Sequence, residues 1–358
     1  MVMIGEGKAT YQGETLDGAE ALERAGLKPV VLSSKEGLIL LSGTTSVTAF
    51  ASLAIYDAQT LSLTADIAGS FTLEVLKGTL MAMDERLMAV RPHPDQINTA
   101  ANIRAILKDS PMLERCRGHR VQDALSIRCM PQLHGPVKKA VKDAQATLAI
   151  ELNSSVDNPL IFDEEDGGAV ALMGCNADGT YAGMASDNLC IAITDLCKMS
   201  NSRIDRLLNS LVSELPAFLN KNADFNNGLM MIQYASAGLQ GELRILAHPA
   251  VVDNLTTCAN QEDYVNMGYN AAKKAYDSMH LAKYILAAEL ICDGQALDCY
   301  EDKRCAKGTQ AIYDLLRSKV PEMDNDMPLT PYLEAVAQQI IDRAYIRTVE
   351  ASVGALKF

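Results

Sequence analysis

The sequence has no tryptophan, and only 6 phenylalanines and 12 tyrosines occur among its 358 residues. Its core must therefore be built from leucine, isoleucine, valine, alanine and methionine, which suits packed helices better than a β-sandwich. Apolar residues still make up 48% of the chain, an ordinary share for a soluble globular protein. A chain of this length can bury a sizeable core and form one large or two medium domains.

Basic residues are also scarce, since 32 lysines and arginines stand against 45 aspartates and glutamates, for a net charge of −13. No Lys/Arg-rich block is present, which argues against a nucleic-acid partner. No uninterrupted apolar run reaches the roughly 18 residues of a membrane span, and the first residues lack the basic flank and apolar region of a secretory signal. We predict a cytoplasmic protein with neither a membrane nor a nucleic acid as partner.

Metal-binding patterns are missing as well. The nine cysteines are an odd number and include no C-x-x-C pair, and the five histidines show no H-E-x-x-H spacing. We therefore expect reduced, mostly structural thiols and no metal site.

Apolar residues recur at close to helical spacing along most of the chain, beginning with Val47, Phe50 and Leu53 in a proline-free segment. The predicted helices cover residues 44–77, 95–108, 138–152, 187–211, 228–247, 262–297, 306–318 and 330–353. The longest exceed the usual globular mean of about 11–12 residues and are typical of a large antiparallel bundle or of an oligomer with a shared helical core.

We predict one continuous all-α architecture, because no internal repeat and no low-complexity linker interrupts the chain. Residues 1–43 form a short segment of extended pieces and turns. Residues 44–300 form the central bundle of long helices, and residues 301–358 form a C-terminal helical segment.

Four predicted non-helical segments collect polar residues. They are residues 35–45, residues 121–132, residues 153–160 with 174–176, and residues 258–264. Arg128 is the best candidate for an anion contact, because its planar guanidinium matches a carboxylate with two parallel hydrogen bonds. Gln122 and Gln132 offer amides that can orient a small polar ligand.

Glu262 is predicted at the start of the long helix 262–297. There the helix dipole stabilises a carboxylate, which could also accept a proton or pair with an ammonium group. Structural roles remain open for all of these residues: a helix cap for Glu262, an ion pair for Arg128 and a turn for residues 157–159. Composition and spacing alone indicate only a helical protein with clustered polar loops.

Eight short segments occur in order along nearly the whole chain: MIGEG (3–7), KEGL (35–38), RPHPDQ (91–96), VQDALSIRCMPQ (121–132), ELNSSVDNPLIF (151–162), ASDNLCIAI (185–193), LAHPAVVDNL (246–255) and ANQEDYVNMG (259–268). Together they resemble the histidine and phenylalanine ammonia-lyase family. The resemblance implies an all-α fold whose long helices form the core of a homotetramer.

The opening residues MVMIGEGK have a special meaning in this family. The resemblance places IGEG shortly after an Ala-Ser-Gly triplet, which cyclises into methylidene-imidazolone (MIO), the electrophile of the reaction. No Ala-Ser-Gly occurs in these 358 residues, and the family's N-terminal tyrosine base has no counterpart. We therefore expect MIO and the base on a partner chain, with this chain as the C-terminal subunit of a split lyase that is inactive alone. A truncated derivative or an inactive paralogue is the alternative.

The resemblance assigns roles residue by residue. Arg128 matches the arginine that binds the substrate carboxylate, and Gln122 matches the glutamine near it. Glu262 matches the glutamate that contacts the substrate imidazole in the histidine enzymes, within an Asn-Gln-Glu-Asp motif that also includes Gln261. Asn176 matches the asparagine of a Gly-Asn-Phe loop in the substrate pocket.

Three positions depart from the family pattern. Ser42 replaces an asparagine whose amide lies beside MIO and the substrate amine. Leu125 replaces a tyrosine whose hydroxyl takes part in proton handling, and Ala177 replaces the phenylalanine of the Gly-Asn-Phe loop, which opens the pocket. Losing a buried polar partner commonly costs ~1–3 kcal/mol. These changes favour either a different substrate or a degenerate site.

Two functions from different classes follow. In the first, the chain joins an MIO-bearing subunit and copies of itself and removes ammonia from histidine or a related α-amino acid. In the second, it is a non-catalytic scaffold or regulatory subunit that keeps only the bundle. An aminomutase, which adds the ammonia back at the β-carbon, is a variant of the first.

Overall fold

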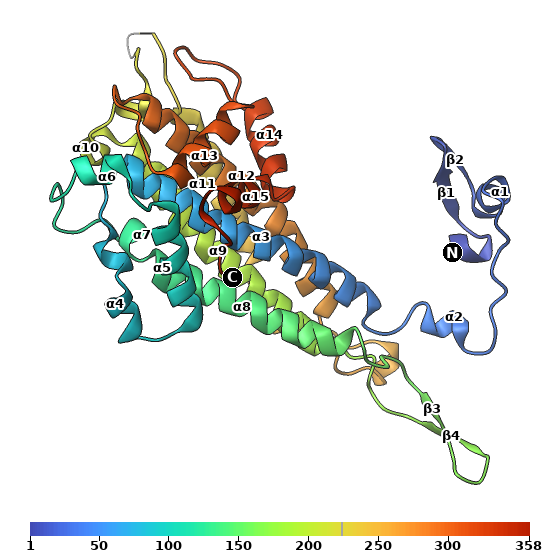
Figure 1. Cartoon of the computed structure of the whole chain (residues 1–358). Coiled ribbons are helices and arrows are strands. Elements are labelled where there is room, and N and C mark those ends of the chain that lie inside the picture. Colours follow the sequence, from blue (N-terminus) through green and yellow to red (C-terminus); the bar gives the residue numbers. More distant parts are fainter. Residues whose placement is uncertain (223–224) are drawn as a thin grey trace. The chain divides into compact units, whose positions relative to one another are not determined.

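The computed structural model describes residues 1–222 and 225–358, and most of them are helical, which confirms the predicted all-α fold. The chain divides into two compact units (Figure 1). The first unit contains Met1–Thr45 and Ser155–Asp178, and the second contains Ser46–Ser154 and Gly179–Phe358. None of the helices in this described part is both long enough and apolar enough to cross a bilayer.

The first unit consists of small elements. They are η1 (Val2–Ile4), β1 (Lys8–Tyr11), β2 (Glu14–Asp17), α1 (Gly18–Arg24), α2 (Glu36–Ile39), β3 (Leu160–Asp163) and β4 (Ala169–Leu172). β1 pairs with β2, and β3 with β4, both as antiparallel hairpins. The prediction of extended pieces holds for the first hairpin. It missed α1 and α2, and it missed the second hairpin because its strands are too short to show a clear alternation.

The second unit is built on five long helices: α3 (Thr45–Val75), α8 (Met130–Glu151), α9 (Thr180–Leu208), α11 (Met230–Leu246) and α12 (Gly268–Asp298). Shorter elements surround them: η2 (Leu80–Met83), α4 (Glu85–Ala89), α5 (Pro94–Ile106), α6 (Pro111–Arg115), α7 (Leu125–Arg128), α10 (Ser210–Ser213), η3 (Ala217–Leu219), η4 (Cys258–Asn260), α13 (Lys307–Arg317), α14 (Thr330–Ile341) and α15 (Ala344–Val353).

Helices α9 and α12 run in the same direction along each other. Near their N-terminal ends, a Cβ on Gly183 would lie 2.9 Å from Gly268 Cα, so the absence of a side chain allows the two backbones to touch. About twenty residues further along both helices, Arg203 of α9 forms an ion pair with Glu289 of α12. The matching offsets at both ends make the pair parallel.

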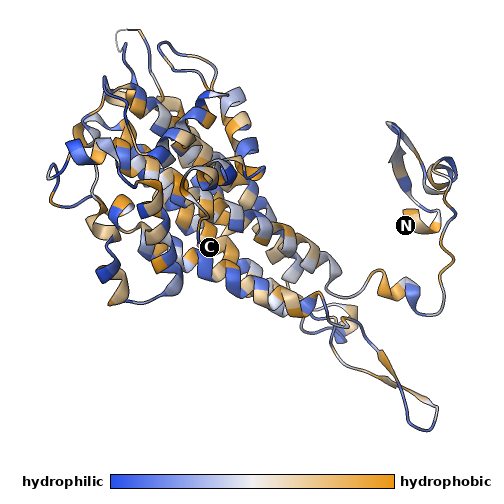
Figure 2. Ribbon diagram, in the orientation of Figure 1, coloured by the Kyte–Doolittle hydropathy of each residue, from blue (hydrophilic) through white to orange (hydrophobic). Residues whose placement is uncertain are grey.

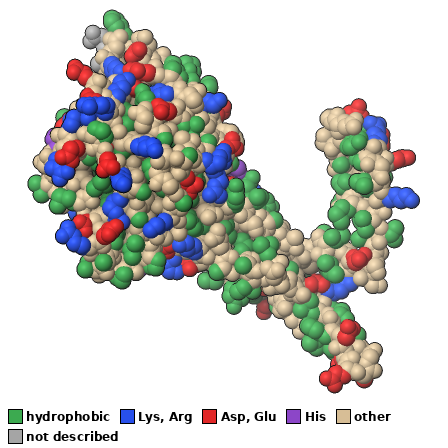
Figure 3. Space-filling model, in the orientation of Figure 1, with side chains coloured by type: hydrophobic (Ala, Val, Ile, Leu, Met, Phe, Trp, Pro, Cys, Tyr) green, Lys and Arg blue, Asp and Glu red, His purple; other side chains and the backbone are tan. Residues whose placement is uncertain are grey.

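Helix α3 has the same direction, and α8 has the opposite one. Phe50 of α3 contacts the ring of Tyr269 of α12 at 5.6 Å, while Thr72 lies against Glu289 at the other end. From Thr60 to Val75, α3 is buried on every side, as is typical of a helix inside a core. The hydroxyl groups of Thr60, Ser62, Thr64 and Ser70 donate to backbone carbonyls of α3 itself. Asp66, Thr72 and Glu74 instead bond to side chains outside α3. Figure 2 shows hydrophilic and hydrophobic residues mixed along the helices, and Figure 3 shows charges of both signs on the visible surface.

The helix expected over 187–211 already begins at Thr180, and three further predicted helices also differ in their boundaries. The helix expected over 262–297 begins at Gly268, because Cys258, Ala259 and Asn260 have φ values of 50°, 51° and 71°, which a right-handed helix cannot contain. The helix expected over 330–353 is two helices, interrupted where Arg343 has φ 58°. The helix expected over 138–152 already begins at Met130, because proline is tolerated in the first turn.

Candidate functional site

The arginine segment, residues 121–130, contains three of the predicted site residues. Arg128 ends the single turn of α7 and is half-buried. Its Nε is completely buried without a hydrogen-bond partner, and no ion pair to its guanidinium exists within the described residues. A desolvated cation without a partner is costly, so the side chain is suited to receive an anion.

Gln122 and Leu125 lie on the same segment, and both side chains are exposed. The segment is fixed at its start by Asp123, whose Oδ2 accepts a hydrogen bond from the backbone N–H of Thr79 at 2.7 Å. The structure therefore brings Gln122, Leu125 and Arg128 to one surface of the second unit.

The glutamate loop, residues 254–267, holds the other two predicted residues of this unit. Glu262 is exposed, accepts a hydrogen bond from Thr257 Oγ1 at 2.8 Å and also forms a backbone bridge with Thr257. Gln261 lies beside it, also exposed. The turn between Thr257 and Gln261 consists of three consecutive non-glycine residues with positive φ. Such conformations cost of order 1–3 kcal/mol each and cluster at functional sites.

Polar side chains that the prediction did not single out hold the glutamate loop in place. Asp187 of α9 accepts hydrogen bonds from the backbone N–H groups of Ala250 and Val251 at 2.7 and 2.9 Å. Asn254 spans the loop, because its Oδ1 accepts from the N–H of Val265 at 2.9 Å and its Nδ2 donates to the carbonyl of Asp263 at 3.0 Å. Asp187 lies in the segment ASDNLCIAI and Asn254 in LAHPAVVDNL, so their place in two of the family-like segments could have indicated a functional role.

One chain does not bring Arg128 and Glu262 together. The arginine segment contacts Arg203, at the level of Glu289 on α12, whereas the glutamate loop precedes the first residue of α12, Gly268. Helix α12 advances 21 residues between Gly268 and Glu289, or about 31 Å at 1.5 Å per residue. The two groups therefore lie toward opposite ends of the bundle.

The remaining predicted residues belong to the first unit. Ser42 is half-buried, and its backbone N–H donates to the carbonyl of Leu38 at 2.8 Å. Asn176 is exposed, with Nδ2 at 3.5 Å from the carbonyl oxygen of Ser155, and Ala177 is half-buried. An ion pair between Lys35 and Asp157 joins the two stretches of this unit.

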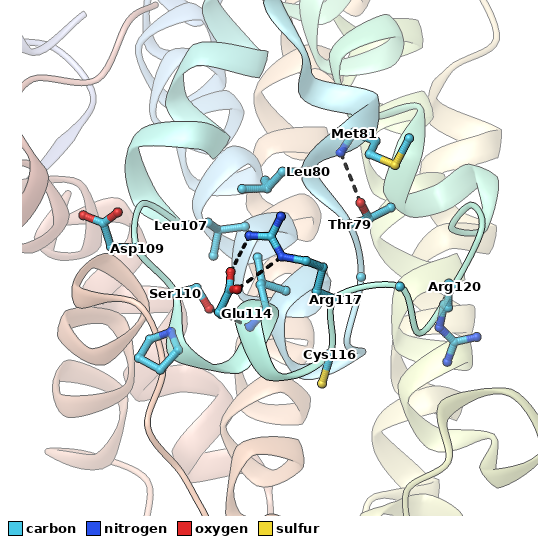
Figure 4. Close-up of a pocket in the computed structure, with 14 residues that line it drawn as sticks. Thr79, Leu80, Met81, Leu107, Asp109, Ser110, Glu114, Cys116, Arg117 and Arg120 are labelled. Carbon is cyan, nitrogen blue, oxygen red and sulfur yellow. Dashed lines mark hydrogen bonds and ion pairs between the residues drawn. The ribbon is translucent and has the colours of Figure 1, made fainter.

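The largest of four cavities described has a volume of about 710 Å³ and lies elsewhere, around α6. Two of its charged residues, Arg117 and Glu114, pair with each other (Figure 4), and Arg120 pairs with Glu214. Neither Arg128 nor Glu262 lines any of these four cavities in the described part of the chain. Of the site residues that the family resemblance assigned, Asn176 alone lines one of these four cavities, which has a volume of about 210 Å³ and lies within the first unit.

MIO cannot form from the residues present, because the 358 residues contain no Ala-Ser-Gly. The predicted site residues of the second unit include a guanidinium at Arg128, with no ion-pair partner among the described residues, and carboxylate and amide groups at residues 261–262. No chemical step through MIO can be derived from these residues.

Comparison with known proteins gives a consistent result. Residues 1–318 match the family model described as aromatic amino acid lyase. A histidine ammonia-lyase of Alkaliphilus metalliredigens is 42% identical over 356 residues, which cover 99% of this chain and 70% of that protein. A histidine ammonia-lyase of Trypanosoma cruzi has a similar structure, with a TM-score of 0.90, 33% identity, and coverage of 98% of this chain and 67% of the other.

A tyrosine aminomutase of Streptomyces globisporus also has a similar structure, with a TM-score of 0.92 at 29% identity over 99% of this chain and 71% of the other. These comparisons confirm the resemblance on which the sequence analysis rests. The histidine ammonia-lyases align over about 70% of their own length and give no support to the prediction that the lyase is divided between two polypeptides.

Proposed function

Because this chain belongs to the aromatic amino acid lyase family, we propose that it forms part of an ammonia-lyase active site that removes ammonia from histidine or a related α-amino acid. Curated relatives named histidine ammonia-lyase are 39–42% identical to it, and these names favour elimination. The solved structures do not separate the two reactions, because a phenylalanine aminomutase is 34% identical and the histidine ammonia-lyase of Trypanosoma cruzi is 33% identical.

Arg128 carries the proposal. Its guanidinium is half-buried, and no partner for it exists among the described residues. A carboxylate placed there would receive two charge-assisted hydrogen bonds and would neutralise the cation. Every α-amino acid has that carboxylate, so Arg128 would orient the substrate whatever its side chain is.

Glu262 and Gln261 would contact the substrate side chain and amine, but from a different copy of the chain. The separation of about 31 Å along α12 means that one chain cannot place Arg128 and Glu262 on the same small molecule. Exposed apolar residues at the N-terminal ends of the long helices, Leu53, Tyr181, Met184 and Tyr269, favour association at the end of the bundle that holds the glutamate loop. We propose a site shared between copies, in the tetramer that the family resemblance implies.

MIO would supply the electrophile for the substrate amine, and a polypeptide segment outside these 358 residues must provide it. Our hypothesis is that this segment belongs to a separate subunit. The residues of this chain would bind the carboxylate, orient the side chain and contribute, through the Glu262 carboxylate, a group able to pair with an imidazole or to take a proton.

The substrate need not be histidine itself. Leu125 is an exposed apolar side chain where the family pattern has a hydroxyl, and Ala177 is smaller than the phenylalanine it replaces. The loss of the hydroxyl at Leu125 and of the aromatic ring at Ala177, together with Ser42 in place of an amide, favours a substrate side chain other than imidazole.

The test is to co-express the chain with an Ala-Ser-Gly-containing N-terminal segment of a related lyase and to follow the absorbance of the alkene product with a panel of α-amino acids. We expect turnover of at least one of them, lost in Arg128→Gln. A confirmed complex that turns over none of the amino acids contradicts the proposal.

A non-catalytic scaffold is the second candidate, and the three departures at Ser42, Leu125 and Ala177 favour it. In that case Arg128→Ala would leave the activity of an associated lyase unchanged. A fall in that activity would count against the scaffold.

A further inference from the structure

A buried ion pair lies directly behind the arginine segment. Arg203 on α9 and Glu289 on α12 are both completely buried. Arg203 Nη2 donates to Glu289 Oε2 at 3.0 Å, and Arg203 Nε donates to Oε1. Two parallel bonds fix the plane of the guanidinium as well as its position.

A further donor of the same guanidinium reaches the arginine segment. Arg203 Nη1 donates to the backbone carbonyl oxygen of Ser126 at 3.3 Å. Ser126 belongs to the single turn of α7, and a helix this short leaves carbonyl groups without partners inside the helix. The buried pair therefore bonds to the main chain two residues before Arg128.

Packing fixes the other side of Arg128. Met130, the first residue of α8, is completely buried against α3. A Cβ on Gly69 of α3 would lie 2.3 Å from Met130 Sδ and 3.5 Å from Arg203 Cζ. The missing side chain at position 69 therefore makes room for both groups, and the segment is fixed at residue 126 and at residue 130.

Glu289 is itself held by more than Arg203. It accepts hydrogen bonds from Ser200 and from Thr72 Oγ1, the latter at 2.9 Å. Burial, and then the charge of Glu289, raise the pKa of Asp293 well above its ordinary value. Glu289 is the one carboxylate within ion-pair distance of Arg203 among the described residues, and two parallel bonds join the two side chains.

From these contacts we propose that Arg203 is a positioning residue for substrate binding. Together with Glu289 it fixes the backbone of α7, from which the Arg128 guanidinium projects toward the substrate carboxylate. No residue in the described part of the chain pairs with Arg128 and sets its direction, so the main chain that carries it must be fixed instead. The inference rests on the proposed role of Arg128.

Arg203→Lys is the variant to test. A lysine keeps the positive charge opposite Glu289, but an ammonium cannot make the two parallel bonds and also reach Ser126 in the same geometry. Arg317→Lys is the matched control. Arg317 pairs with the buried Asp298, also on α12, but its remaining bonds go to the carbonyls of Val320 and Pro321, away from α7.

Two measurements on the assembled protein are needed. Hydrogen exchange of the peptide covering residues 124–130 reports on α7 whatever the ligand, and calorimetric titration with L-histidine reports on binding. For Arg203→Lys we expect exchange about tenfold faster and binding about tenfold weaker, as for the loss of one hydrogen bond to a charged group. Arg317→Lys should change neither. Gly69→Ala, whose Cβ would clash with Met130 Sδ but would meet Arg203 Cζ at the ordinary contact distance of 3.5 Å, should act in the same direction as Arg203→Lys.

The outcomes separate this inference from the proposed function. If Arg128→Gln weakens L-histidine binding but Arg203→Lys and Gly69→Ala do not, the positioning role is wrong and the proposed function stands. If exchange in residues 124–130 is unchanged in both variants, the positioning role is also wrong. If Arg128→Gln binds L-histidine as well as the unmodified protein does, the proposed function fails and this inference fails with it.

Discussion

The arginine segment and the glutamate loop present their functional side chains in contrasting ways. Arg128 projects from a main chain fixed by a buried ion pair and by packing against Gly69. Glu262 lies on an exposed loop held by single hydrogen bonds and a strained turn. The contrast fits the chemistry of the substrate, because the carboxylate is common to all amino acids while the side chain varies. The fixed arginine segment would bind the carboxylate that all amino acids share, and the glutamate loop would discriminate between substrate side chains.

The largest expected effect comes from the buried charges behind the arginine segment. Lys138 of α8 forms a completely buried ion pair with Asp66 of α3 and also donates to Thr99 Oγ1 at 3.0 Å. Lys138→Met leaves Asp66 without its cation, so we expect the free energy of unfolding to fall by about 3–5 kcal/mol. Urea denaturation measures this fall.

Lys139→Met is the control for that prediction. The Lys139–Asp143 pair is exposed on the same helix, and such pairs contribute about 0–1 kcal/mol. An equal fall in the free energy of unfolding in the two variants would show that the buried ion pair does not stabilise the part of the second unit that carries the arginine segment.

Arg128→Gln should weaken L-histidine binding about 100-fold, as two charge-assisted hydrogen bonds at about 1.5 kcal/mol each would require. Stability should hardly change, because the guanidinium has no partner to lose among the described residues. Calorimetric titration tests the expected loss of binding, and thermal melting of the same sample tests the expected unchanged stability. A large loss of stability would mean that Arg128 has a structural role.

Protonation of His134 in mild acid should destabilise the part of the second unit that carries the arginine segment. Burial lowers the pKa of His134 below 6.5, although Asp66, which accepts its Nδ1–H at 2.8 Å, opposes the shift. The unfolded chain therefore binds a proton before the folded one does. Stability should fall as the pH drops below about 6.5, by at most about 1.4 kcal/mol per pH unit.

The pKa of Asp66 is also lowered, because Lys138 and His134 together more than offset the effect of its burial. Its contribution is present above its ordinary value of 3.8 and is lost only when the pH falls below that value, so the two groups act in separate ranges. His134→Gln should flatten the slope of unfolding free energy between pH 7 and 5. A slope that persists in this variant would assign the effect to another group.

The smallest effect is expected at the glutamate loop. Thr257→Val removes the hydrogen bond to Glu262 while keeping the shape of the side chain. The loss of about 1 kcal/mol should weaken L-histidine binding about fivefold and leave glycine binding unchanged, because glycine has a carboxylate and no side chain. Equal weakening of both ligands would contradict the division of roles between the two ends.

The sequence predicted the long helices well, since α3, α9 and α12 follow from apolar spacing and from the absence of proline. It placed Glu262 wrongly at a helix start, because the positive φ values of residues 258–260 have no signal in Cys-Ala-Asn. It also gave no sign of the Arg203–Ser126 bond, which joins residues 77 positions apart through a backbone carbonyl. The distance between Arg128 and Glu262 was equally hidden, because it depends on the parallel direction of α9 and α12.

The burial of α3 on every side has a consequence for how the chain folds. Thr72 meets its partner Glu289 only 217 residues later in the sequence. Contacts this remote carry a large loop-closure entropy and make folding slow. During synthesis the side of α3 that packs against α12 stays exposed to solvent until α12 has left the ribosome. Because the helices follow one another in this order, we expect nascent chains to aggregate easily and to need chaperones.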